Sequence, residues 1–195
     1  MKTILLETFV ASGVVLYLTK EAVAYIKHRR KIKRDKRHTF DIVLPKVNDI
    51  YEEMAQSAST LGAGRVIILN AHNGGGRPMV GSELKSSALY EIPLGLRSIK
   101  DSWKNQPLDQ TYIEMLVELD RNEFVTLETG KMQESALRRL YFTDHILATA
   151  VMKITQDEKN FYYIAYNFDR PIDVNDAKVQ ETIRSAVNKI REAWV

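Results

Sequence analysis

Apolar residues recur at steps of three and four after Thr39, and this spacing predicts an amphipathic helix. One face of a helix repeats about every 3.6 residues, so such side chains share a face that can pack on a core. The sequence STLGAG, with Gly62 and Gly64, predicts the end of this helix. The apolar positions are Phe40, Val43, Val47, Ile50, Tyr51, Met54 and Ala58.

Shorter apolar runs predict strands. The run RVIILN (65–70) is continuous, which is typical of a strand buried on both faces. The runs SSALYEIP (86–93) and EFVTLET (123–129) are weaker. The strongest are HILATAVMKITQ (145–156) and FYYIAYNF (161–168), and the short connection DEKN between them predicts an antiparallel hairpin.

Three further segments have helical spacing. These are DQTYIEMLVELD, QESALRRLYF and a last helix that buries Val179, Ile183, Val187 and Ile190 and is capped by Asp173 or Asn175. Helices and strands do not alternate regularly, which disfavours a parallel sheet. We therefore predict an α/β fold with an antiparallel sheet of about five strands and flanking helices.

The chain opens with a hydrophobic segment. Residues 3–19 are apolar apart from Glu7, and AVAYI extends this character to Ile26. The run is at the short end of the roughly 17–25 residues that span a bilayer. A basic segment follows at once, whereas a cleaved signal peptide carries its charge before the apolar run. The basic residues are Lys27, Arg29, Arg30, Lys31, Lys33, Arg34, Lys36 and Arg37.

This charge pattern predicts three parts of the chain. Residues 1–26 are expected to form a single-pass membrane-anchor helix, 27–38 a basic juxtamembrane segment and 39–195 the folded domain. Since positive charge marks the cytoplasmic flank, we expect the N-terminus outside and the domain in the cytoplasm. Two alternatives stay open: a helix lying on anionic lipid, and a soluble helix packed against a partner chain.

Net charge separates the basic segment from the domain. The whole chain carries +3. Residues 27–38 hold eight Lys or Arg and one Asp, residues 1–26 are balanced, and 39–195 therefore carry −4. The acidic domain disfavours specific nucleic-acid binding, and we expect membrane lipid as the partner of the basic segment. The absence of cysteine excludes disulfides, thiolate zinc sites and a cysteine nucleophile.

Two stretches resemble a GAF-like domain, the α/β sensor fold related to PAS. They are the opening helix leading into GRVIILNAHNGG and the final hairpin leading into NDAKVQETIRSAVNKIREAW, and the resemblance covers about residues 40–195. The sequence RVIILNAHNGG…SALYEIPLG is similar to sequences of phage and bacterial proteins that have a GAF-like domain behind an N-terminal hydrophobic segment. The resemblance implies small-molecule binding between sheet and loops, or dimerisation through the first and last helices.

The same resemblance identifies no cofactor. The chain lacks the cysteine that covalent bilin attachment needs, and it lacks the Asn-Lys…Phe…Asp-Glu pattern of cyclic-nucleotide GAF domains. The cofactor is therefore unknown, and a small-molecule ligand stays open.

The glycine-rich stretch after the first strand has three interpretations. As a ligand site, its turn exposes backbone N–H groups. As a structural turn, Asn and Gly supply positive φ while Asn70 and His72 fix the loop. As a metal site it is similar to the Asn-Gly-His-Gly-Gly-Asn segment of creatininase-like hydrolases, but only His72 and His145 lie outside the basic segment and a site needs three or more ligands. The candidate ligand-binding residues are Asn70, His72, Asn73, Gly74, Gly75, Arg77, Tyr90 and Glu91.

The leading hypothesis is a non-enzymatic, membrane-anchored GAF-like module for protein interaction or sensing, with a phage origin implied by the resemblance. Its partner would be another protein or a second copy of the chain. The alternatives are a small-molecule sensor with a pocket at the HNGGG loop, and a metal-dependent hydrolase. Glu91 is expected to face solvent unless it meets His72 in a pocket, and the Asp144–His145 pair is expected to be structural.

Overall fold

The computed structural model describes residue 27 and residues 40–194. The chain divides into two compact units, Met1–Lys46 and Val47–Val195. In the first unit, Lys27 and residues 40–46 are helical, while residues 1–26 and the rest of the basic segment lie outside the described residues. No helix in the described ranges combines the length and hydrophobicity that crossing a bilayer requires.

A single antiparallel sheet forms the centre of the second unit. Its strand order is β3-β2-β1-β6-β5-β4, so the first strand and the last pair at the middle. The neighbours β1 and β2, and β5 and β6, are also antiparallel. The strands are β1 (Arg65–His72), β2 (Lys85–Pro93), β3 (Gln106–Pro107), β4 (Phe124–Glu128), β5 (Ala148–Gln156) and β6 (Asn160–Phe168).

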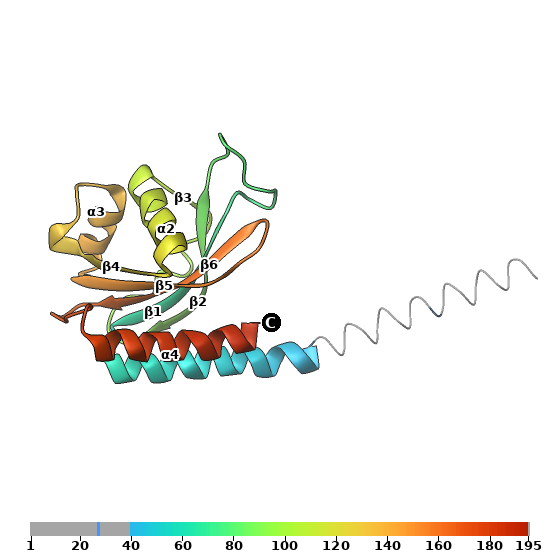
Figure 1. Cartoon of the computed structure of the whole chain (residues 1–195), viewed down its shortest axis with the longest axis horizontal. Coiled ribbons are helices and arrows are strands. Elements are labelled where there is room, and N and C mark those ends of the chain that lie inside the picture. The colour runs from blue at the N-terminus through green and yellow to red at the C-terminus, as the bar shows by residue number, and fades with distance from the viewer. Residues whose placement is uncertain (1–26, 28–39, 195) are drawn as a thin grey trace, which may run out of the picture. The chain divides into compact units, whose positions relative to one another are not determined.

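Two helices cover one face of the sheet (Figure 1). Residues 47–61 of the first helix (40–61) and α4 (Ala177–Trp194) pack there on one hydrophobic cluster. Met54, Ile183 and Val187 are fully buried in it, because the 3.6-residue spacing places their side chains on one side of each helix. Successive side chains of β1 point to opposite faces of the sheet, so Val66 and Ile68 both belong to this cluster.

The helices α2 (Gln110–Asn122) and α3 (Ala136–Thr143) cover the opposite face (Figure 1). A short 3-10 turn, η1 (Thr129–Lys131), precedes α3. Ile67 and Leu69 point to this side and pack with Met115 and Leu119 in a second hydrophobic cluster. All residues of both clusters come from the second unit, which is therefore a self-contained folding unit.

The predicted order of helices and strands is confirmed, and so is the antiparallel sheet. The sheet has six strands rather than about five, because the two-residue β3 is too short to leave an apolar pattern. Two details were wrong. Phe40 and Val43 are exposed rather than buried, and α4 is capped by Asp176, whose Oδ1 accepts from the backbone N–H groups of residues 178 and 179.

Candidate functional site

An open groove of about 480 Å³ lies beside the end of β1. Its apolar lining comes from α2, from the ends of β1 and β6, and from the 73–84 loop, through Ala71, Pro78, Leu84, Ile113, Leu116, Val117 and Phe161. Its rim is polar and comes from the end of α2 and the β5–β6 hairpin, through Asp120, Arg121, Gln156, Asp157, Lys159 and Asn160. An apolar floor with a few polar groups, at this size, is what small-molecule sites offer.

Local sequence explains why the groove forms there. The buried stripe of α2 is Tyr112, Met115, Leu116 and Leu119. Ile113 and Val117 form a second apolar row beside it, four residues apart, and Val117 is 45% exposed. Ala71 is the smallest side chain of β1 and lines the groove. The groove is not apparent from any motif in the sequence, although this second apolar row on α2 is a signal for it.

The candidate loop residues bond mainly to one another and to neighbouring strands. Asn73 Nδ2 donates to the Arg77 carbonyl at 2.8 Å, and Asn70 Nδ2 donates to Asn160 Oδ1 at 2.9 Å. Arg77 forms an exposed ion pair with Glu158. Gly74 and Gly75 have φ of 87° and 116°, a region that favours glycine. These contacts agree with the structural interpretation of the loop.

His72 holds the start of this loop. Its Nδ1 accepts from the Gly74 N–H at 3.0 Å, so in the neutral ring Nε2 carries the proton and donates to Ser87 Oγ at 2.9 Å. Partial burial lowers the pKa of His72, and the positive charge of Lys85 lowers it further. A neutral imidazole is the form that can accept from Gly74, so the two effects support the same geometry.

Tyr90 and Glu91 lie on opposite faces of β2. The Tyr90 ring meets Tyr51 at 5.3 Å and Trp194 at 6.0 Å between centroids, on the α4 face. Burial raises the pKa of Tyr90, with a smaller contribution from Tyr51. Glu91 points to the α2 face and is 8% exposed. The expectation of a solvent-facing Glu91 was therefore wrong, and the structure does not bring Glu91 to His72.

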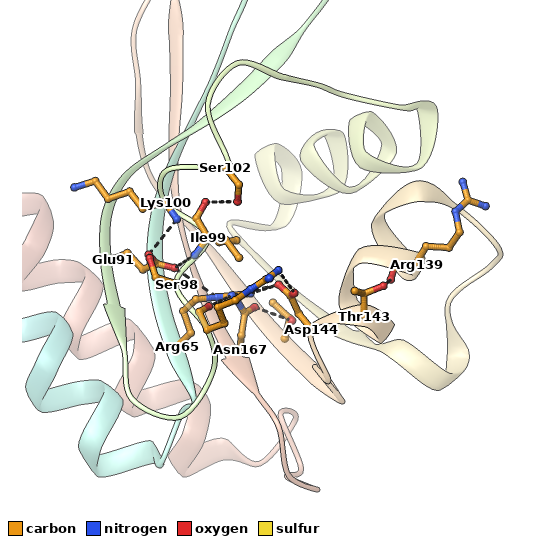
Figure 2. A network of polar contacts seen from close by, with 12 residues as sticks. Arg65, Glu91, Ser98, Ile99, Lys100, Ser102, Arg139, Thr143, Asp144 and Asn167 are labelled. Atoms are coloured by element: carbon orange, nitrogen blue, oxygen red, sulfur yellow. Dashed lines mark hydrogen bonds and ion pairs between the residues drawn. The ribbon is translucent and has the colours of Figure 1, made fainter.

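Glu91 belongs to a buried ionic cluster that the sequence analysis missed (Figure 2). Arg65, with 1% of its side chain exposed, lies 3.3 Å from Asp144 and 3.9 Å from Glu91 between charged atoms. Arg65 Nη1 also donates to the Arg97 carbonyl at 2.8 Å. The Asn167 amide satisfies all its neighbours when Oδ1 accepts from Arg65 Nη2 and Nε at 3.2 and 3.1 Å and Nδ2 donates to Thr149.

The cluster fixes the loop that follows β2. The Glu91 carboxylate accepts from the Ser98 hydroxyl, from the Ile99 N–H at 2.9 Å and from the Lys100 N–H at 3.1 Å (Figure 2). Because Asp144 ends α3 and Asn167 lies on β6, Arg65 joins three separate parts of the fold. The arrangement holds its charges in fixed pairs and presents no free nucleophile.

Side chains fill the space between the sheet and α2. The Tyr163 hydroxyl bonds the Ser86 hydroxyl at 2.9 Å and the Tyr112 hydroxyl at 2.8 Å. Burial raises the pKa of Tyr112 and of Tyr163 well above the usual range of tyrosine. Both hydroxyls therefore stay protonated, and they pair with one another in the interior.

The catalytic candidates do not assemble. Asp144 is buried while the adjacent His145 is exposed and has φ of 56°, which agrees with a structural role for the pair. Among the described residues, no group of three or more His, Asp or Glu side chains is placed to hold a metal ion.

Comparison with known proteins identifies the fold. No family model matches the sequence, and no curated protein matches it closely. Among solved structures, a GAF domain of a Synechocystis protein in its photoproduct state has a TM-score of 0.56 at 13% identity, over 76% of this chain and 92% of that one. The phycoerythrobilin-bound GAF domain of a cyanobacterial phytochrome has 0.53 at 12% identity, over 79% and 92%.

A third GAF domain matches with a similar score. It belongs to a two-component sensor histidine kinase of Bacillus halodurans, with a TM-score of 0.52 at 14% identity, over 75% of this chain and 91% of that one. These similarities show that the chain has a GAF-like α/β fold. At such identities they carry no ligand from those proteins to this one.

Proposed function

We propose that this chain is a non-enzymatic sensor module that binds a small molecule with an apolar body in the groove beside α2, and that residues 1–26 tether it to a membrane. The groove itself carries the proposal, because its volume of about 480 Å³ lies within the roughly 300–1,000 Å³ of small-molecule sites. The GAF-like fold supports it, since one structural neighbour is a phycoerythrobilin-bound GAF domain of a phytochrome and another is the GAF domain of a sensor histidine kinase. The site differs from the HNGGG pocket that the sequence suggested.

The test is fluorescence titration with N-phenylnaphthylamine, an uncharged dye that brightens in apolar sites. It uses residues 39–195, which contain both hydrophobic clusters, after cooperative unfolding has been checked. Val117→Lys places a charge at the groove and is expected to weaken binding about tenfold. Phe142→Lys replaces an apolar residue of α3 that is 76% exposed and does not line the groove, and it should leave the affinity unchanged. Equal affinities in all three proteins would reject the groove.

The membrane tether has its own test. Val10→Arg combined with Val14→Arg interrupts the apolar run, and each arginine disfavours insertion by about 3 kcal/mol. The full chain should then move from a carbonate-washed membrane pellet to the supernatant. Met79→Arg with Val80→Arg adds the same charge on the exposed loop and should remain in the pellet. A wild-type chain recovered in the supernatant excludes the tether.

A protein partner is the second candidate, favoured by the tip of the 73–84 loop. Met79 and Val80 are 75% and 109% exposed, which is unusual for adjacent apolar residues. If the tip binds a protein, Met79→Ser with Val80→Ser should abolish a crosslinked adduct formed in cells, while dye binding at the groove persists. An adduct that survives this change, or no adduct with the wild-type chain, would exclude the tip as an interface.

A further inference from the structure

The charges on the rim of the groove differ in their partners. Asp120 is neutralised by Lys153, whose Nζ lies 2.7 Å from Oδ1. Asp157 accepts at Oδ1 from the Lys159 N–H at 2.7 Å and from the Asn160 N–H at 2.9 Å. These two residues, with the Asn160 side-chain amide, lower the pKa of Asp157. Both carboxylates therefore already have donors within the protein.

The two rim cations are different. In the described part of the chain, the Arg121 guanidinium and the Lys159 ammonium form no hydrogen bond or ion pair, although both line the groove. The Lys159 charge acts on Asp157 only weakly, as the smallest contribution to its lowered pKa. The groove therefore has two cations with unused hydrogen-bond donors beside its apolar floor, and its charged groups carry +1 when Lys153, the partner of Asp120, is counted with them.

We infer that the ligand of this groove is an amphipathic organic anion. Its apolar body would lie on Ala71, Val117 and Phe161, and its single carboxylate, sulfonate or phosphate would lie beside Arg121 and Lys159. The guanidinium offers a planar pair of donors that suits such groups, and the ammonium adds a second charge. The inference rests on the proposed function, and it adds the chemical class of the ligand.

Two dyes with the same apolar body separate this inference from the proposed function. Anilinonaphthalene sulfonate carries a sulfonate that N-phenylnaphthylamine lacks. Exposed ion pairs contribute modestly, so we expect the anionic dye to bind the wild-type domain about fivefold to tenfold more tightly than the neutral one. Salt screens such contacts, so this ratio should fall as ionic strength rises.

The ratio of the two affinities is the readout in the variants. Arg121→Gln with Lys159→Gln should bring it close to one. Lys104→Gln with Arg139→Gln removes two positive charges that do not line the groove and should keep the wild-type ratio. Equal binding of both dyes to the wild-type domain refutes the anion inference and leaves the groove in place. A ratio that survives the rim double variant, or falls as far in the control, also refutes it. If neither dye binds, the proposed function fails, and the inference fails with it.

Discussion

Asp144 forms ion pairs with two arginines, one buried and one exposed. Replacing each arginine in turn tests whether burial decides how much an ion pair stabilises the domain. Arg65 Nη1 lies 3.3 Å from Asp144 Oδ2, with 1% of its side chain exposed. Arg97 Nη2 lies 3.5 Å from Oδ1, with 78% exposed. The distances are nearly equal, so a view based on distance alone predicts equal effects. Burial predicts a large difference.

The expected magnitudes follow from the groups left behind. Arg65→Met leaves Asp144 and Glu91, whose side chains are 4% and 3% exposed, without their buried cation. Breaking a buried pair from one side lowers the free energy of unfolding by about 3–5 kcal/mol. An exposed pair contributes roughly 0–1 kcal/mol, so Arg97→Met should have little effect. The total stability of such a domain is about 5–15 kcal/mol, so the first variant loses a large part of it.

The assay is urea unfolding of the domain, followed by the fluorescence of Trp103 and Trp194. At a slope of about 2 kcal/mol per molar, Arg65→Met should lower the midpoint by about 2 M and Arg97→Met by less than about 0.5 M. Adding Asp144→Asn to Arg65→Met removes one unpaired charge and should recover part of the loss. Equal losses of stability in the two single variants would contradict the role of burial. A double variant whose loss equals the sum of the losses of Arg65→Met and Asp144→Asn, each measured alone, would contradict it as well.

Three further predictions concern the same domain. Tyr163→Phe removes the hydroxyl shared by Ser86 and Tyr112 and should lower the free energy of unfolding by about 1–3 kcal/mol in urea titrations, whereas Tyr162→Phe, outside that network, should change it little. Glu91→Ala should speed amide hydrogen exchange at residues 99 and 100 well before global unfolding, because both N–H groups lose their acceptor. His72 has a lowered folded-state pKa, so the folded state favours the neutral ring. The contribution of His72 to the stability of the folded state is complete above pH about 6.5, and it is lost as the pH falls from there through the folded-state pKa. Amide hydrogen exchange at Gly74, measured by NMR, should therefore rise over that pH range in the wild type but not in His72→Gln.

Each of these has an outcome that contradicts it. An equal effect of the two tyrosine variants would mean that the buried hydroxyl chain adds nothing. Unchanged amide exchange at residues 99 and 100 in Glu91→Ala would mean that the loop after β2 is stable without the Glu91 carboxylate. A rise at Gly74 with the same midpoint in His72→Gln would assign the titration to another group.

Periodicity predicted the fold well because the two packed faces alternate cleanly along β1. Val66 and Ile68 face one helix layer while Ile67 and Leu69 face the other, so the run had to be buried on both sides. The antiparallel pairing of β5 and β6 was equally predictable, because a short polar turn between two apolar runs is typical of a hairpin. These features depend on local sequence alone.

The site was harder to predict because it depends on contacts between distant residues. Arg65 begins a hydrophobic strand, and nothing near it in the sequence indicates that residues 91, 144 and 167 surround it. The HNGGG stretch attracted attention through its composition, yet His72 and Asn73 mainly bond their own loop and its neighbours. The groove needed Val117 and Phe161, which lie on different elements and carry no motif.

Stability and the proposed binding are separated along β1. Arg65 begins the strand within the buried ionic cluster, and Ala71 lines the groove near its other end. At about 3.3 Å per residue the two positions are about 20 Å apart on the same face of the sheet. Ile67 and Leu69 lie between them in a packed core, so a change in the groove need not disturb the cluster. Variants of Val117, Arg121 and Lys159 should therefore alter affinity while the urea midpoint stays near that of the wild type, and variants of Arg65 should do the reverse until the domain unfolds.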